Sequence, residues 1–231
     1  SSPIGCHPFG GKSIFFGVDD PDLYTGGLLA LDGATGEVEL LGTGEAPTAG
    51  ALAAARFEHR LYLASESIWR TTGAVSETEN LGGLGSSQME VATAGDALFF
   101  GASELYRFDR ETSGFAPLTP ATVDGHYPVR MTAQGPDLLF FAWQATTGTE
   151  LWRSDGTPEG TGLVVDLRPG PPSSIYEPLY FPGQPELTRI VPLGSIALFA
   201  ADDGVHGEEL WRTDGTAAGT VMVRDLFPGA Y

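Results

Sequence analysis

Two stretches near the end of the chain, GTELWRSDGTPEGTGLVVDLRPG (residues 148–170) and GEELWRTDGTAAGTVMVRDLFPG (residues 207–229), are nearly the same. Aligned with Gly148 on Gly207, they agree at 15 of 23 positions. Such a repeat indicates stacked copies of one supersecondary unit, because a single unit of this size cannot bury its own apolar face. The duplication therefore decides the expected fold, while it says much less about function.

Weaker copies of the same unit precede these two. They centre on Leu29, Trp69 and Tyr106, and an apolar stretch that reads as a strand runs ahead of each copy. Five units in the chain give about 46 residues each, which is the size of a four-stranded propeller blade. We therefore expect one all-β domain, a five-bladed β-propeller of four-stranded antiparallel blades. The expected blades cover approximately residues 1–44, 45–84, 85–122, 123–171 and 172–231.

The last copy shows how one blade is expected to be built. Residues 187–193 alternate and form the innermost strand, and 195–202 form an apolar second strand that should be covered on both faces. Residues 208–214 and 220–226 form the third and fourth strands, joined by an Asp-Gly-Thr turn. A tryptophan that recurs at one position in the blade is expected to fill the space between blades and not to bind a ligand.

A lone four-stranded sheet cannot cover both of its faces, and closure of the five blades into a ring would solve that problem. The sequence PGAY at the end and SSPI at the start together resemble the linker between blades, which favours closure. The alternative is that the five units belong to a longer array. The chain does not begin with Met, so we expect either a processed mature protein or a trimmed piece.

Residues 150–157 and 209–216 match every fixed letter of the ELWxxDGT repeat, a motif found in arrays in secreted bacterial proteins. The chain therefore resembles this repeat family, and the first three units lack one or more of the fixed letters. The resemblance implies a β-propeller and export from the cell, and it implies no particular activity. In size the chain is also similar to five-bladed propeller lectins, which is a similarity of architecture alone.

The charge of the chain excludes some partners. Its formal net charge is -18 and its pI is about 4.3, and a field of this sign repels phosphate backbones and anionic membrane surfaces. No apolar run approaches the length of a membrane span. We therefore expect neither nucleic acid nor a membrane as a partner, and we expect a monomer.

The candidate binding residues lie where the blades differ from one another. Glu90, Arg130 and Arg189 fall on innermost strands, where they could form a channel mouth or a salt-bridge network that plugs a narrow pore. Aromatic residues of the loops could stack on sugar rings or on a peptide, or could cap the core. These aromatic candidates are Tyr127, Trp143, Tyr176 and Tyr180.

Metal sites are a weaker possibility. Cys6, His7 and His126 offer a thiol and imidazoles, which suit Zn or Cu, although a buried cysteine and exposed histidines are the alternative. The acidic loops at residues 19–22 and 202–209 offer oxygen ligands for Ca²⁺, although loops of this kind are commonly just solvated.

No catalytic signature such as GxSxG or HExxH is present. We therefore expect a secreted binding or scaffold module whose ligand is a carbohydrate or an extracellular protein, bound at the loop face or the channel mouth. The alternative is a small propeller enzyme or a metal-binding protein that uses the central channel.

Overall fold

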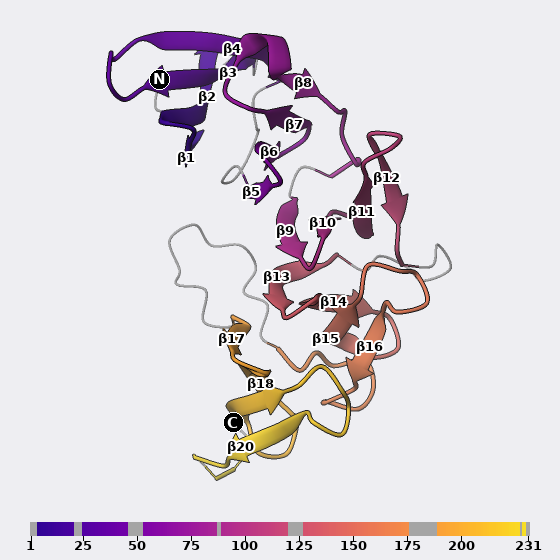
Figure 1. Ribbon diagram of the computed structural model, residues 1–231. Coiled ribbons are helices and arrows are strands. Elements are labelled where there is room, and N and C mark those ends of the chain that lie inside the picture. The colour runs from indigo at the N-terminus through magenta and orange to yellow at the C-terminus, as the bar shows by residue number, and fades with distance from the viewer. Residues whose placement is uncertain are drawn as a thin grey trace. The chain divides into compact units, whose positions relative to one another are not determined.

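The computed structural model describes residues 4–20, 25–45, 53–86, 89–119, 127–175, 189–226 and 228–229. Within these ranges the chain forms β-strands and a single 3-10 turn (Val75–Glu77), and it forms no α-helix. The strands make five separate four-stranded sheets, in which consecutive strands are neighbours (Figure 1). None of the described segments is a helix of the length and apolarity that a membrane crossing requires.

The sheets follow one another along the chain. The first contains β1 (Ile4–Phe9), β2 (Lys12–Asp20), β3 (Thr25–Asp32) and β4 (Val38–Glu45). The second contains β5 (Ala53–Phe57), β6 (Arg60–Ala64), β7 (Ile68–Thr71) and β8 (Glu79–Asn80). The third contains β9 (Glu90–Ala94), β10 (Ala97–Gly101), β11 (Leu105–Asp109) and β12 (Gly114–Pro117). The fourth contains β13 (Val129–Gln134), β14 (Asp137–Gln144), β15 (Gly148–Ser154) and β16 (Gly162–Val165). The fifth contains β17 (Val191–Leu193), β18 (Ile196–Asp202), β19 (Glu208–Thr213) and β20 (Val221–Arg224).

The chain divides into two compact units. One comprises Ser1–Ala92 and Phe108–Gly114, and the other comprises Thr93–Arg107 and Phe115–Tyr231. In the first unit, the first sheet packs against the second through large apolar side chains and Trp69. The buried residues of this core are Ile14, Phe16, Leu28, Ala30, Leu41, Leu61, Leu63 and Trp69. Trp69 is therefore a packing residue, as the sequence predicts.

The second unit has its main core between the fourth and fifth sheets. Phe141 of β14 meets Phe199 of β18 edge to face, with ring centroids 5.8 Å apart. Trp211 lies in the same core and donates a hydrogen bond from Nε1 to the backbone oxygen of Ala201, at 3.0 Å. The hydrogen bond satisfies the polar end of a buried indole, so the tryptophan can fill the space between two blades without an orphaned donor.

The innermost strands of the fourth and fifth sheets, β13 and β17, are neighbours. Thr132 Oγ1 donates to the backbone oxygen of Ile190 at 3.3 Å, and Gln134 Nε2 donates to that of Gly194 at 3.1 Å. The strand that begins each sheet is also its edge strand. This is the position that the sequence predicts for the innermost strand of a blade.

The Asp-Gly-Thr turn has the same hydrogen bonds in the fourth and fifth sheets. In the fourth, Asp155 Oδ1 accepts hydrogen bonds from the backbone N–H and the hydroxyl of Thr157, at 2.9 and 2.7 Å. In the fifth, Asp214 and Thr216 repeat both bonds at the same distances. The motif letters are therefore turn chemistry, as the sequence predicts.

The second glycine of the turn is also explained. A Cβ atom at Gly160 would lie 2.1 Å from the carboxylate of Asp155, and one at Gly219 would lie 2.0 Å from that of Asp214. Only glycine leaves room for the aspartate that closes the turn, which accounts for the repeated pattern DGTxxGT.

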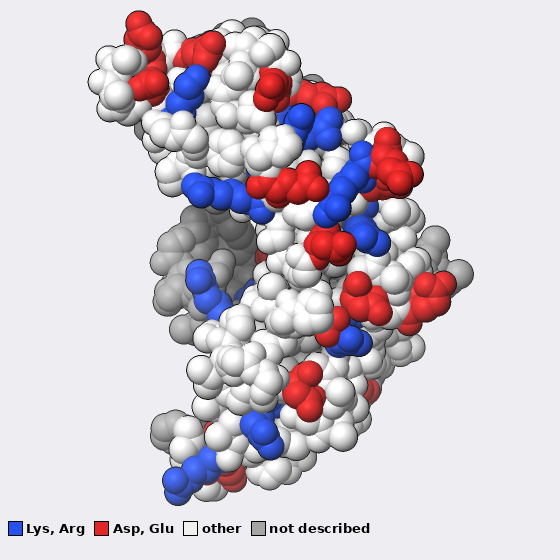
Figure 2. Space-filling view, in the orientation of Figure 1, with Lys and Arg blue, Asp and Glu red and all other residues white. Residues whose placement is uncertain are grey.

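One sequence expectation is wrong for the fifth sheet. Strand β18 is not covered on both faces, because Ala197, Phe199 and Ala201 are buried while the residues between them are half-exposed. The expectation holds instead for β14, in which Leu138, Leu139, Phe140, Phe141 and Ala142 are all buried. Figure 2 shows basic and acidic side chains interspersed on the face drawn.

Candidate functional site

The strongest candidate site lies at the loop end of the fourth sheet. Val129 of β13 pairs with Phe141 of β14, so Tyr127, two residues earlier, and Trp143, two residues later, lie at the same end of this strand pair. Tyr127 is 60% exposed and Trp143 is 38% exposed. Large aromatic side chains at this exposure are unusual in a chain that buries its other tryptophans, so they indicate a contact surface.

Arg130 lies close to these two aromatics in the chain and has a special backbone conformation. Its φ angle is 57°, in the left-handed region, and the β13–β14 pairing is irregular between Val129 and Thr132. A bulge of this kind changes the direction of a side chain, and such bulges are common next to functional sites. The irregularity therefore sets Arg130 apart from the regular ladder that follows it.

Arg189 comes from the fifth sheet to the same region. It is exposed and directly precedes Ile190, whose backbone oxygen accepts the hydrogen bond from Thr132 of β13. Arg130 of β13 and Arg189, two residues before β17, therefore lie on neighbouring segments of the chain. We call Tyr127, Arg130, Trp143 and Arg189 the loop-end patch.

The patch has a definite chemistry. Tyrosine, tryptophan and arginine are the residues that carry most binding energy at protein interfaces, because they combine a large apolar area with a few directed hydrogen bonds. The exposed guanidinium of Arg189 also favours anionic partners such as carboxylates, whereas Arg130 is partly buried and its Nη1 atom is buried. The patch can therefore bind an exposed segment that carries acidic and apolar groups.

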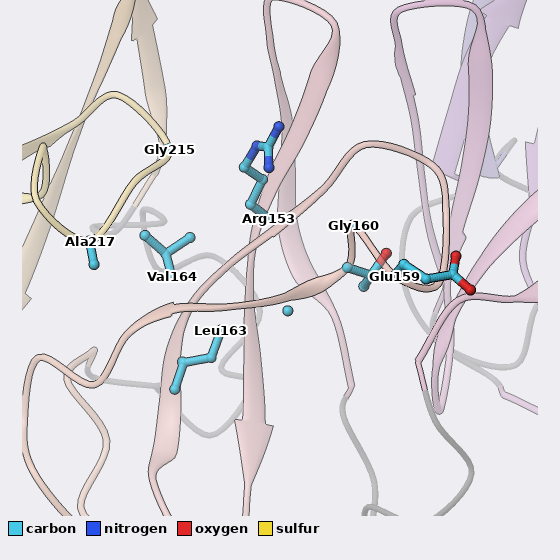
Figure 3. A pocket seen from close by; sticks show the side chains of 9 residues that line it. Arg153, Glu159, Gly160, Leu163, Val164, Gly215 and Ala217 are labelled. Atoms are coloured by element: carbon cyan, nitrogen blue, oxygen red, sulfur yellow. The ribbon is translucent and has the colours of Figure 1, made fainter.

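A concave feature lies between the motif turns of the fourth and fifth sheets. It is a groove of about 290 Å³, lined by Arg153, Glu159, Gly160, Thr161, Gly162, Leu163, Val164, Gly215 and Ala217. Figure 3 shows Leu163 and Val164 of β16 near the turn that carries Gly215 and Ala217. Its mostly small side chains offer little that could hold a ligand in one orientation.

The arginine of this groove has a structural role that recurs along the chain. Arg153 forms an ion pair with Asp137 at 2.9 Å, and its Cδ atom would lie 3.3 Å from a Cβ at Gly215 in the next motif turn. In the preceding sheet, Arg107 donates to the backbone oxygen of Gly156, which is the same position of the turn, at 3.3 Å. The motif arginine therefore ties one blade to the turn of the next, and we assign the groove to packing.

The other predicted binding residues are not part of the loop-end patch as described. Glu90 begins β9 and belongs to the other compact unit from Arg130 and Arg189, so it is described apart from the loop-end patch. Tyr176 and Tyr180 lie outside the described residues. Of the predicted binding residues within the patch, Tyr127 and Trp143 lie at one end of the β13–β14 pair, and Arg130 and Arg189 lie on neighbouring segments of the chain.

The predicted metal ligands are only partly described. Cys6 is exposed and His7 is half-buried in β1, where consecutive residues point to opposite faces of the sheet. His126 lies outside the described residues. The described ranges contain no group of three His, Cys, Asp or Glu side chains arranged to hold a metal ion.

The acidic loop after β18 is held together by internal hydrogen bonds. Asp203 Oδ1 accepts from the backbone N–H groups of Val205 and His206, and Asp203 Oδ2 is 2.7 Å from His206 Nδ1. Asp202 forms an ion pair with Arg168 at 2.8 Å. These carboxylates therefore already have partners within the protein. Residues 21 and 22 of the other acidic loop lie outside the described ranges.

One feature escaped the sequence analysis. Glu150 and Asp166 belong to the repeat, and each has a buried carboxylate oxygen for which the described residues supply no hydrogen-bond donor. The recurrence of both acids is visible in the sequence, because Glu209 and Asp225 occupy the same two positions in the second copy of the repeat. Sequence alone does not show that these pairs are buried.

Comparison with known proteins supports the fold. No family model and no curated protein matches the sequence. Among solved structures, TolB from Acinetobacter baumannii is similar with a TM-score of 0.50 and 13% identity, over 95% of this chain and 53% of TolB. A puromycin hydrolase is similar at a TM-score of 0.48 and 16% identity, over 86% of this chain and 33% of that one. A chain of a Nidogen/Laminin complex is similar at 0.45 and 9% identity, over 95% and 78%.

The likeness to TolB concerns the fold alone, and this chain spans about half the length of TolB. Five consecutive four-stranded antiparallel sheets, with recurring inter-sheet tryptophans and motif turns, define the class of the protein. It is an all-β protein of the five-bladed β-propeller class.

Proposed function

We propose that this propeller is a binding module and that the loop-end patch contacts its partner. The observation that carries the proposal is the pair of exposed aromatics, Tyr127 and Trp143, at the end of the β13–β14 pair, with Arg130 and Arg189 on neighbouring segments of the chain. The partner we favour is a protein segment with acidic and apolar side chains.

The position of Trp143 supports its role in a contact surface. Phe141, two residues earlier on β14, packs into the core against Phe199. Trp143 therefore continues the row of side chains that faces the fifth sheet, but it does so beyond the core, where it is 38% exposed. A rigid strand thus holds the indole at the edge of the fifth sheet, and rigid aromatic groups lose little conformational entropy on binding.

We also propose that the protein is a secreted bacterial monomer of the ELWxxDGT repeat family. The match of residues 150–157 and 209–216 to the motif supports the family, and the acidity of the chain supports solubility outside the cell. The exposed aromatics could also stack on a sugar, so the experiment below includes glycans.

The test is a random-peptide phage library panned on the immobilised whole chain, followed by affinity measurement of the enriched peptides as synthetic peptides. We expect the enriched sequences to combine Asp or Glu with apolar residues. Trp143→Ala and Arg189→Ala should each weaken binding about tenfold or more, which corresponds to about 1.4 kcal/mol.

Val205→Ala is the matched control, because Val205 is an exposed apolar residue of the same unit outside the patch. Peptides that bind all three variants as tightly as the parent would contradict the proposal, as would a failure to enrich any peptide. If a glycan array instead gives binding that Trp143→Ala abolishes, the patch is a carbohydrate site.

A further inference from the structure

Glu150 is an ionisable residue in an unusual position. It lies in β15 and is completely buried, with 0% of its surface exposed. Its Oε2 atom accepts a hydrogen bond from the backbone N–H of Leu167 at 3.1 Å. Its Oε1 atom is also buried and accepts no hydrogen bond from any residue in the described part of the chain.

A second carboxylate, that of Asp166, also has a buried oxygen atom without a hydrogen-bond donor among the described residues. Asp166 follows β16, and the pairing of Leu151 with Val165 places it directly across from Glu150 at the end of the ladder. Asp166 Oδ2 accepts from the backbone N–H of Gly170 at 3.3 Å, but Oδ1 is buried and, among the described residues, has no hydrogen-bond donor. Two buried acceptors without donors thus occur on facing positions of neighbouring strand ends, and the charge of Asp166 acts on Glu150.

Two ionised carboxylates in this position would be unfavourable. An unpaired buried charge is costly, and a second negative charge beside it adds repulsion. A single proton removes both problems, because it converts one acceptor into a donor for the other. We propose that Glu150 and Asp166 share one proton, which Oε1 of Glu150 donates to Oδ1 of Asp166.

The electrostatics of the site agree with this arrangement. Burial raises the pKa of Glu150 to about 7, and the charge of Asp166 acts in the same direction. Hydrogen bonds from Ser174 and from the backbone of Leu167 and Arg168 oppose the rise in pKa. The other charged groups nearby are Arg168 and Asp202, which pair with each other at 2.8 Å.

The fifth sheet carries the same two residue types, Glu209 and Asp225, at the equivalent positions of the repeat. Glu209 is 3% exposed. In the third sheet, Glu104 occupies the same motif position as Glu150, and the residues that follow β12, Leu118, Thr119 and Pro120, include no aspartate. Glu104 therefore supplies a control that lacks the aspartate.

The proposal predicts how stability depends on pH. The folded state binds the proton more tightly than the unfolded state, in which the pKa returns to about 4.5. The unfolding free energy therefore falls as pH rises from about 4.5 to about 7, and it levels off above that range. We expect the unfolding equilibrium constant to rise on the order of a hundredfold over this interval.

The experiment compares chemical unfolding of the whole chain from pH 4.5 to 8 for the parent, Glu150→Gln and Glu104→Gln. The glutamine amide of Glu150→Gln can donate to Asp166 at every pH, so this variant should lose the decline or most of it. Glu104→Gln should keep it. Carboxyl ¹³C NMR titration of the parent protein gives a readout that requires no variant, and one carboxyl should titrate near pH 7.

Three results would overturn the proposal. The first is a parent whose glutamate and aspartate carboxyls all titrate below about pH 5. The second is a Glu150→Gln variant with the parent's pH profile. The third is a rise in stability on adding Ca²⁺ that Glu150→Gln abolishes, which would make the pair a cation site instead. If Glu150→Gln does not fold, Asp166→Asn tests the same bond, because its amide can donate to Glu150.

Discussion

The fourth and fifth sheets carry the same motif letters, yet they are buried differently. In the fourth sheet Leu151 is 0% exposed and contacts the core between the two sheets, whereas its counterpart Leu210 is 38% exposed. Trp152 and Trp211, the next residues, are both buried. Within this unit the fourth sheet uses both of its faces for packing, and the fifth packs against the fourth through one.

This difference shows which residues of the motif depend on a neighbouring blade for their burial and which do not. The tryptophan is buried in both sheets, and the turn makes the same hydrogen bonds in both. The leucine faces the next blade, so its environment depends on that neighbour. Two copies of a repeat can therefore share their motif letters and still contribute unequally to the free energy of unfolding. The reason is that the burial of a side chain depends on the interface with the neighbouring blade.

The largest expected effect is at the motif leucine. Leu151→Ala should lower the unfolding free energy by about 3 kcal/mol, because it removes a fully buried side chain and leaves a cavity. Leu210→Ala should cost less than about 1 kcal/mol, because Leu210 is partly solvated already. Denaturant unfolding of both variants measures the difference. Equal losses would show that Leu210 is covered as completely as Leu151.

The next effect should be equal in the two sheets. Gly160→Ala and Gly219→Ala should each cost about 1–3 kcal/mol, because the new Cβ would collide with the aspartate that closes the turn. Gly162→Ala is the control, since a Cβ there meets no atom within 4 Å. Thermal and denaturant unfolding measure all three. A loss in only one sheet would contradict a purely local role for the turn.

The motif arginines should differ by a smaller amount. Arg153→Ala removes the ion pair with Asp137 and the contact with the next turn, so we expect a loss of about 1 kcal/mol. Arg212→Ala should change stability by less than about 0.5 kcal/mol, because Arg212 is exposed. A double-mutant cycle of Arg153 with Asp137 isolates the pair. A coupling energy near zero would mean that Arg153 stabilises the fold only through its contact with the turn that carries Gly215.

The smallest effect is the acid dependence of the turns. Hydrogen bonds from Thr157 lower the pKa of Asp155 below 3.8, and those from Thr216 lower that of Asp214. This contribution to stability is present above about pH 3.8 and is lost as pH falls through the lowered pKa values. We expect Asp155→Asn and Asp214→Asn each to reduce the acid-induced drop in melting temperature by about 2 °C. Melting curves from pH 2 to 5 measure it, and an effect at neutral pH alone would contradict the assignment.

Much of the fold could be predicted because its signals are local. The apolar strands, the Asp-Gly-Thr turn and the recurring tryptophan each report a requirement that a few neighbouring residues satisfy. Arg130 and Arg189 could be related to each other for the same reason, because they stand at equivalent positions of the repeat. The bulge at Arg130 and the juxtaposition of Tyr127 with Trp143 were not readable, because strand register depends on pairing across the sheet.

The sequence alone determined that the chain is built of five repeated four-stranded units and that the motif letters serve turns and packing. Tertiary structure decided which copies of a repeated side chain are buried, which carboxylates face each other in the interior and which aromatics stay at the surface. The reason is physical: turn and strand preferences depend on residues near in the chain, whereas solvation and charge depend on what another segment covers.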